Sequence, residues 1–232
     1  MDIIERGRYL QEDLLDVMRR TALRGFPGVL PFADSKIYTA ECAKGDLLPC
    51  QFYMMRPQLD KVAEIVAHFR AERAGMGIDL LHNDGFVVYE SDGREYAFTP
   101  PIVEIVDGEP LLIDGIHRTI FAGKRKFTAV FVENVPPEYY HYALPNDNGW
   151  NDVSMLDGDV LPEGFARKKL RYPMESYKKW FREYPFPAAT NIKRAHDAAL
   201  TASPPRRTGG KAPAPRPSLV SVLAACTIPR HR

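Results

Sequence analysis

One stretch decides the fold: Pro110-Leu111-Leu112-Ile113-Asp114-Gly115-Ile116-His117-Arg118-Thr119. Leu111 to Ile113 is a short apolar run, which predicts the end of a buried strand. Asp114-Gly115 then breaks the strand. From Ile116 to Lys124 the pattern is helical, because Ile120 and Phe121 fall on the same face as Ile116. The stretch therefore predicts a strand, a tight turn and the start of a helix.

The predicted helix start is suited to bind an anion. Backbone N–H groups in a first helical turn lack intrahelical acceptors and lie at the positive end of the helix dipole. His117 and Arg118 add an imidazole and a guanidinium to the same turn. Phosphate is the usual anion at such a place. The predicted phosphate-binding residues are Asp114, Gly115, Ile116, His117, Arg118 and Thr119, joined by Arg56 from just before the preceding helix.

Composition limits the class of protein. The chain has 232 residues, of which 45% are hydrophobic and 11% aromatic, as in folded globular proteins. A net charge of +1 argues against a protein whose main task is to coat nucleic acid. The three cysteines form no CxxC pair, which argues against a zinc site and favours a reducing cytoplasm. No apolar run approaches the ~20 residues that span a bilayer, so we expect a cytoplasmic protein with no membrane partner.

Hydrophobic periodicity predicts the order of the remaining elements. Residues 3–24 show the spacing of a helix, and a second helix is predicted over 58–70. The predicted strands are 36–43, 86–89, 95–98, 101–106, 111–113 and 128–132. Asp-Gly pairs at 92–93 and 107–108 predict tight turns between neighbouring strands. This mixture predicts an α+β (mixed α/β) fold with a small mixed sheet.

Changes in composition divide the chain into four segments. We predict a helical N-terminal segment at 1–35, a core at 36–135, an aromatic-rich C-terminal extension at 136–200 and a disordered basic tail at 201–232. Within the extension, helices are predicted near 137–143 and 173–184.

Three blocks of the core resemble the ParB/sulfiredoxin-fold superfamily. Leu47-Leu48-Pro49, before the second helix, resembles that superfamily's opening Leu-x-Pro, and Pro101-Ile102-Val103 resembles its Pro-Ile-Val strand. Leu112 to Arg118 resembles its Asp-Gly-x-His-Arg box, and Phe127 to Val132 its closing strand. The resemblance covers the core at 36–135 and implies that the box binds nucleotide phosphates.

The branches of this superfamily differ at the box. Sulfiredoxins carry a catalytic cysteine where this chain has Ile116, so sulfinic-acid repair is not expected. ParB itself has Gly-Glu-Arg-Arg in the box, binds CTP and continues into a DNA-binding region. The box of this chain is closest to that of free serine kinase-like members, which reads Asp-Gly-His-His-Arg. The resemblance therefore implies a phosphotransferase that uses ATP or ADP, with CTP as a further nucleotide and Mg²⁺ as metal, on a small molecule.

The opening motif departs from that of the kinases. Their Leu-x-Pro-His-Glu ends on a glutamate that acts as base for the substrate hydroxyl, whereas this chain has Cys50 and Gln51 in the aligned positions. A glutamine cannot accept a proton as a general base near neutral pH. Another carboxylate would have to serve, and the candidates are Glu41, Asp60, Glu64, Asp147 and Asp152. Asp147 and Asp152 lie in a polar loop and are also the candidate Mg²⁺ ligands.

Three interpretations of the core stay open at this point. The first is the phosphotransferase, whose partners are a nucleotide and a small-molecule substrate. The second is a ParB-like, DNA-associated protein that uses nucleotide binding as a switch. The third is a nuclease-like member of the same fold. Trp150, within the polar loop, could cover a bound base or anchor the loop to the core.

Overall fold

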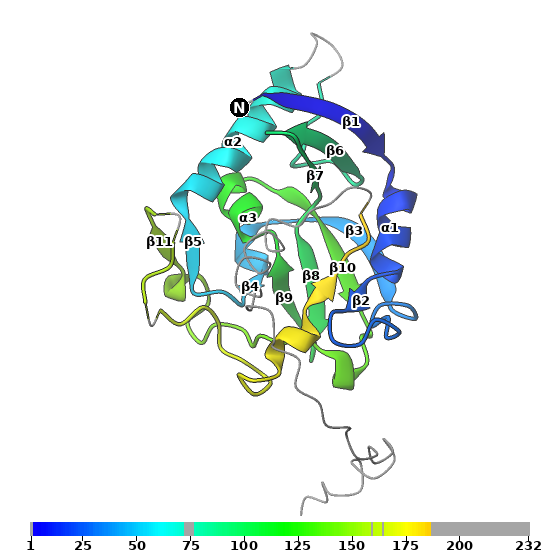
Figure 1. Ribbon diagram of the computed structural model, residues 1–232, viewed down its shortest axis with the longest axis vertical. Helices are drawn as coiled ribbons and strands as arrows, with labels where there is room; N and C mark the ends of the chain where they lie inside the picture. Colours follow the sequence, from blue (N-terminus) through cyan, green and yellow to red (C-terminus); the bar gives the residue numbers. More distant parts are fainter. Residues whose placement is uncertain (1, 72–76, 159, 164, 187–232) are drawn as a thin grey trace, which may run out of the picture. The chain divides into compact units, whose positions relative to one another are not determined.

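The computed structural model describes residues 2–71, 77–158, 160–163 and 165–186, which all belong to one compact unit, Met1–Lys193 (Figure 1). The predicted tail at 201–232 lies outside the described residues. The α-helices of the described part are α1 (Gln11–Arg19), α2 (Arg56–Ala71) and α3 (Ile116–Ala122). None of them is both long and apolar enough to cross a membrane.

The largest sheet is mixed, with the strand order β3-β10-β8-β9-β4. Its strands are β3 (Lys36–Cys42), β4 (Leu48–Pro49), β8 (Ile102–Val106), β9 (Glu109–Asp114) and β10 (Phe127–Glu133). The β10 strand pairs antiparallel with β3 and parallel with β8, while β9 pairs antiparallel with β8 and parallel with β4. The predicted α+β fold with a small mixed sheet is confirmed.

Alternation along the strands gives this sheet two buried faces. In β10, Val130 and Val132 join the cluster that contains the apolar side of α1, whereas Phe127 and Ala129 join the cluster under α3. Successive side chains of a strand point to opposite faces, so one strand supplies both clusters. Figure 1 shows α1 beside β3 and α3 beside α2, in agreement with the contacts between these elements.

The N-terminal prediction is wrong over its first part. Residues 3–24 do not form one helix, because Ile3–Tyr9 is a strand, β1, and the helix covers only Gln11–Arg19. The β1 strand pairs antiparallel with β6 (Phe86–Ser91), which pairs with β7 (Arg94–Phe98) in a three-stranded sheet. The burial of β1 alternates along its length, and β6 offers it an open edge. Long-range pairing of this kind outweighs local helical spacing.

Two Asp-Gly turns form as predicted. Asp92 and Gly93 have φ angles of 53° and 70°, and Asp107 and Gly108 have 54° and 84°. Positive φ at both central residues is the geometry of a type I′ hairpin turn, which suits the twist of the flanking strands. The β6–β7 and β8–β9 hairpins follow from these two turns.

The described part of the C-terminal extension contains little helix. The helices predicted near 137–143 and 173–184 are only 3₁₀ turns, at Pro137–Tyr139 and Tyr177–Trp180. Short strands do more of the docking: β11 (Ser154–Leu156) pairs with β5 (Tyr53–Met55), and β12 (Arg182–Glu183) pairs with β2 (Ala22–Leu23). Aromatic packing replaces helix formation, because the extension's aromatic rings stack on one another and on the cluster around α1.

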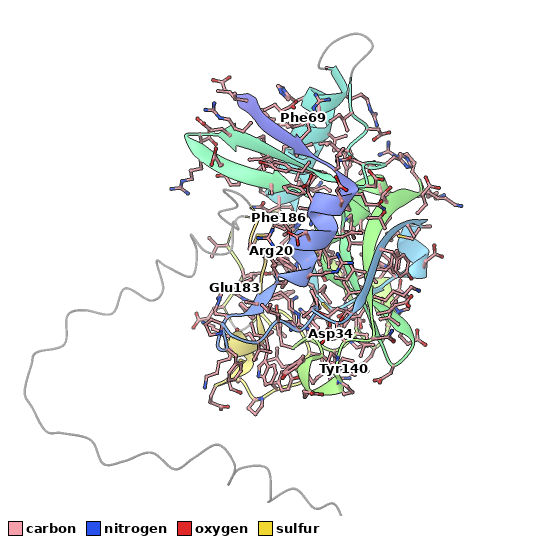
Figure 2. The ribbon with its side chains drawn as sticks, turned by 90° about the vertical axis from the view of Figure 1, so that its right-hand side faces the viewer. Arg20, Asp34, Phe69, Tyr140, Glu183 and Phe186 are labelled. Atoms are coloured by element: carbon pink, nitrogen blue, oxygen red, sulfur yellow. The ribbon has the colours of Figure 1, made fainter. Side chains whose placement is uncertain are left out.

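A buried ion pair fastens the extension to the large sheet. Glu104 on β8 is fully buried, and one of its carboxylate oxygens accepts hydrogen bonds from Nε and Nη2 of Arg182 at 2.9 and 2.7 Å. The other oxygen accepts from the backbone N–H of His141 at 3.1 Å. Figure 2 views the molecule from the side on which α1 lies, with Arg20 labelled just beyond this helix and Glu183, the neighbour of Arg182, on β12.

Candidate functional site

The box forms the predicted strand, turn and helix. Asp114 is the last residue of β9, Gly115 has a φ of 92°, and α3 begins at Ile116. A Cβ atom on Gly115 would lie 2.8 Å from the Cα of Pro101, so glycine is required both by the positive φ and by the close approach. The first hydrogen bond of α3 runs from the N–H of Thr119 to the carbonyl oxygen of Gly115, at 3.0 Å.

Arg118 holds the box together. Its Nη1 donates to the carbonyl oxygen and to the hydroxyl oxygen of Thr99, at 2.6 and 2.7 Å, and its Nη2 donates to Asp114 at 2.9 Å. The guanidinium also lies 5.7 Å from the ring centroid of Phe98. With 13% of its side chain exposed, Arg118 ties the turn to the end of β7, so its first role is to position the box.

His117 joins the box to the start of α2. Its Nε2 accepts a hydrogen bond from the backbone N–H of Met55 at 3.1 Å, so the proton of the neutral ring is on Nδ1. Met55 is followed directly by Arg56, the first residue of α2. This hydrogen bond therefore brings together two predicted phosphate-binding regions that are far apart in the chain, the box and the start of α2 at Arg56. The Arg56 side chain is exposed and forms an ion pair with Asp157, with 2.6 Å between Nε and Oδ1.

One comparison with known proteins finds a family. The sequence model of the ParB CE domain matches residues 13–154, which is more than half of the chain. The chain belongs to the ParB CE domain family. No curated protein and no solved structure matches it. The match runs from within α1 to the first residue of β11, includes the box and ends before the last part of the extension.

Two of the predicted phosphate-binding side chains point into the core of the ParB CE domain. Thr119 is fully buried, its hydroxyl has no hydrogen-bond partner in the described part of the chain, and Ile116 is 8% exposed. Together with Ala122 they form the buried side of α3. At these two positions only the backbone is left to face a ligand.

The five candidate carboxylates do not gather at the box. Glu41 on β3 lies 3.2 Å from the Nδ1 of His82, and Asp60 and Glu64 are exposed on α2. Asp147 accepts a hydrogen bond from Lys169 at 2.7 Å. Asp152 accepts from the backbone and the side chain of Asn148, which lowers the pKa of the Asp152 carboxyl below its usual range. In the described part of the chain, none of the five makes a hydrogen bond or ion pair to a box residue.

The polar loop with Asp147 and Asp152 is anchored by Trp150. Its indole N–H donates to the carbonyl oxygens of Lys44 and Leu47, at 2.9 and 2.8 Å, which fixes the loop to the core. The described residues contain no group of three or more His, Cys, Asp or Glu side chains that could hold a metal ion. The Mg²⁺ ligands Asp147 and Asp152 stay a prediction.

The departure from the kinase motif at Cys50 and Gln51 has a structural counterpart. Gln51 donates through Nε2 to the carbonyl oxygen of Tyr53 at 2.6 Å, so its amide is used to shape the loop. Cys50 is buried, and its thiol donates to the carbonyl oxygen of Leu112 at 3.1 Å. Neither side chain is placed to take a proton from a substrate.

Sequence reasoning missed Lys168. Its ammonium lies 3.7 Å from the Cys50 sulfur and 5.0 Å from the ring centroid of Tyr142. No described carboxylate forms an ion pair with it. Because the Cys50 thiol is hydrogen-bonded to the carbonyl oxygen of Leu112, two residues before Asp114, this charge lies near the strand that leads into the box. No motif surrounds Lys168 in the sequence, so only the fold reveals it.

Proposed function

We propose that this ParB CE domain protein binds a nucleotide through its phosphates at the box, with ATP or ADP and Mg²⁺ as the expected ligands and CTP as the alternative. The observation that carries the proposal is the hydrogen bond from Met55 to His117, which brings the start of α2 to the start of α3. In this proposal one ligand reaches the backbone N–H groups at the start of α3, His117 and, once it has turned from Asp157, Arg56, as phosphate binding requires.

The residues of the site have different roles in this proposal. His117 and the backbone at the start of α3 contact the phosphates, and Arg56 turns from Asp157 toward them, since this ion pair is exposed and costs little to break. Arg118 positions the turn through Thr99 and Asp114. Lys168 adds positive charge near the strand that leads into the box.

We further propose that the bound nucleotide donates a phosphoryl group to a small molecule in the cytoplasm. Phosphoryl transfer has a loose transition state, in which catalysis comes mostly from positioning and charge neutralisation. Because this chain has Gln51 in place of the kinase glutamate, removal of the proton from the substrate hydroxyl should suffer more than stabilisation of the charge on the phosphates. Asp114 is the carboxylate of the box itself, and it already accepts a hydrogen bond from Arg118.

A second candidate function is favoured by the family itself. Membership in the ParB CE domain family supports a DNA-associated protein in which nucleotide binding is a switch, and a nuclease-like activity is the third alternative. DNA affinity would fall steeply with salt concentration, because phosphate contacts release counterions. Binding to a DNA duplex at several salt concentrations, with and without nucleotide, separates this function from phosphotransfer.

Calorimetric titration of the full chain with ATP, ADP and CTP, each with and without Mg²⁺, tests nucleotide binding. His117→Ala removes the group that joins the two helices and should abolish saturable binding while the protein stays folded. His82→Ala is the matched control, because among the described residues this exposed histidine side chain pairs with Glu41 and with no residue of the box. Equal binding by both variants and the wild type would place the nucleotide elsewhere.

A further inference from the structure

A small pocket opens between the end of β9 and the C-terminal extension. Asp114 lines it from the box side, Tyr142, Arg182 and Tyr184 line it from the extension, and Arg24 lines it from just after β2. Its free volume is about 30 Å³, which suits a group of a few heavy atoms and not a nucleoside. The pocket shares Asp114 with the box, so a ligand in it would lie next to the proposed phosphate site.

One wall of the pocket contains a guanidinium nitrogen that has no hydrogen-bond partner among the described residues. The Arg182 side chain is 2% exposed; its Nε and Nη2 bind Glu104, and Nη2 also donates to the carbonyl oxygen of Tyr139 at 2.5 Å. The remaining nitrogen, Nη1, is buried and has no hydrogen-bond partner among the described residues. Buried polar groups in folded proteins are nearly always paired, so an orphaned guanidinium N–H beside a pocket indicates that something else satisfies it.

The neighbouring groups favour an acceptor with negative charge. Burial raises the pKa of Tyr184 well above its usual value, so its phenol stays protonated and can donate a hydrogen bond. Arg24 also lines the pocket and forms an ion pair with Glu183, with 3.1 Å between the paired atoms. Asp114 is the one carboxylate that lines the pocket, and Arg118 neutralises it. The described lining of the pocket thus carries two guanidinium groups, Arg24 and Arg182, and one carboxylate, Asp114.

We propose that this pocket binds a small oxyanion, the carboxylate or phosphate group of a second ligand, through Arg182 Nη1 and the Tyr184 hydroxyl. The role of the oxyanion rests on the proposed function: it would anchor, beside Asp114, the small molecule that receives the phosphoryl group. Binding itself requires no nucleotide. The two claims can therefore fail separately.

The test is a titration of the full-length protein with inorganic phosphate and, separately, with acetate, against sodium chloride at equal ionic strength. The ¹⁵N resonances of the Arg182 guanidinium, assigned with Arg182→Lys, report the contact. A saturable shift at Arg182 but not at the exposed Arg6 supports the pocket, and the tighter of the two anions identifies the group. No saturable shift with either anion overturns it, since a buried water then satisfies Nη1.

Tyr184→Phe provides a second variant that leaves the Glu104–Arg182 pair intact. Loss of a hydrogen bond to a charged ligand should weaken anion binding about tenfold or more. Unchanged anion affinity in this variant overturns the proposal. His117→Ala separates the two claims: it should lose nucleotide binding and keep anion binding. If the wild type binds anions and no nucleotide, the anion pocket is supported and the proposed function is contradicted. If it binds nucleotide and no anion, the proposed function is supported and the anion pocket is contradicted.

Discussion

Arg118 donates two hydrogen bonds to Thr99, one to the carbonyl oxygen at 2.6 Å and one to the hydroxyl oxygen at 2.7 Å. This relationship fastens the first turn of α3 to the end of β7, so the box is held in place before any ligand arrives. Backbone donors that are held in place in this way need little rearrangement when negative charge binds.

Arg118→Lys should destabilise the protein, because a single ammonium cannot reproduce the fork that reaches Thr99 and Asp114 together. We expect a loss of about 1–3 kcal/mol in the free energy of unfolding, measured by urea denaturation. Arg125→Lys, just past the C-terminal end of the same helix and exposed, is the control and should change stability by less than about 0.5 kcal/mol. Equal losses in the two variants would contradict the positioning role.

Gly115→Ala should lower the free energy of unfolding more than the same change in an open turn. Both Gly115 and Gly108 have a positive φ, 92° and 84°, so each substitution carries backbone strain. Only at Gly115 would the new Cβ meet neighbouring atoms, at 2.8 Å from Pro101, whereas Gly108 has open space around it. Steric overlap should add about 1–3 kcal/mol to the loss at Gly115. Thermal unfolding of both variants compares them, and similar midpoints would refute the close approach.

The Glu104–Arg182 pair should behave as a coupled unit. Arg182→Met leaves the fully buried Glu104 carboxylate without its cation, and we expect a loss of about 3–5 kcal/mol in the free energy of unfolding. Adding Glu104→Leu removes the stranded charge and should recover a large part of this loss. Chemical denaturation of both single variants and the double variant gives the coupling, and additive losses would show that the two residues act independently.

Glu133 supplies a test of pH dependence. The Tyr38 hydroxyl donates to one oxygen of Glu133 at 2.5 Å and Lys36 to the other at 3.0 Å, and these bonds lower the pKa of the Glu133 carboxyl. A lowered carboxyl pKa stabilises the fold above the unfolded pKa, and this stabilisation disappears as the pH falls through the folded value. Burial, followed by the bond to Glu133, raises the pKa of Tyr38 to about 12.

Tyr38→Phe should therefore move the pKa of Glu133 back toward its ordinary value. The stability difference between wild type and variant should be largest near neutral pH and shrink under acid conditions. Carboxyl ¹³C NMR of Glu133 over an acid titration measures the pKa directly, and Tyr9→Phe, on β1, is a control far from this pair in the chain. An unchanged Glu133 pKa in Tyr38→Phe would show that the hydroxyl is not its main partner.

Local pattern was enough to predict the elements around the box. The apolar run before Asp114, the turn at Gly115 and the two Asp-Gly hairpins depend on neighbours in sequence, and all form as expected. Helix formation at 3–9 was predicted wrongly, because the strand there is stabilised by β6, more than 70 residues away. The spacing of apolar residues in this segment is compatible with a helix and with a strand.

The missed parts of the site depend on contacts distant in sequence. Lys168 reaches Cys50, and Arg182 reaches Glu104, across separations that no local motif records. The predicted roles of Ile116 and Thr119 ignored the direction of their side chains, which the packing of α3 on the sheet decides. The residue types in the sequence were enough to predict a candidate phosphate site. Which atoms of these residues a ligand can reach depends on tertiary packing.

A structure of the full chain with ADP and Mg²⁺ tests the central claim most directly. We predict that the phosphates lie against the backbone N–H groups at the start of α3, with His117 and Arg56 in contact with phosphate oxygens. We also predict that Arg118 keeps its hydrogen bonds to Thr99. A nucleotide bound away from the turn at Gly115, or no bound nucleotide at saturating concentration, would contradict the assignment of the box as a phosphate site.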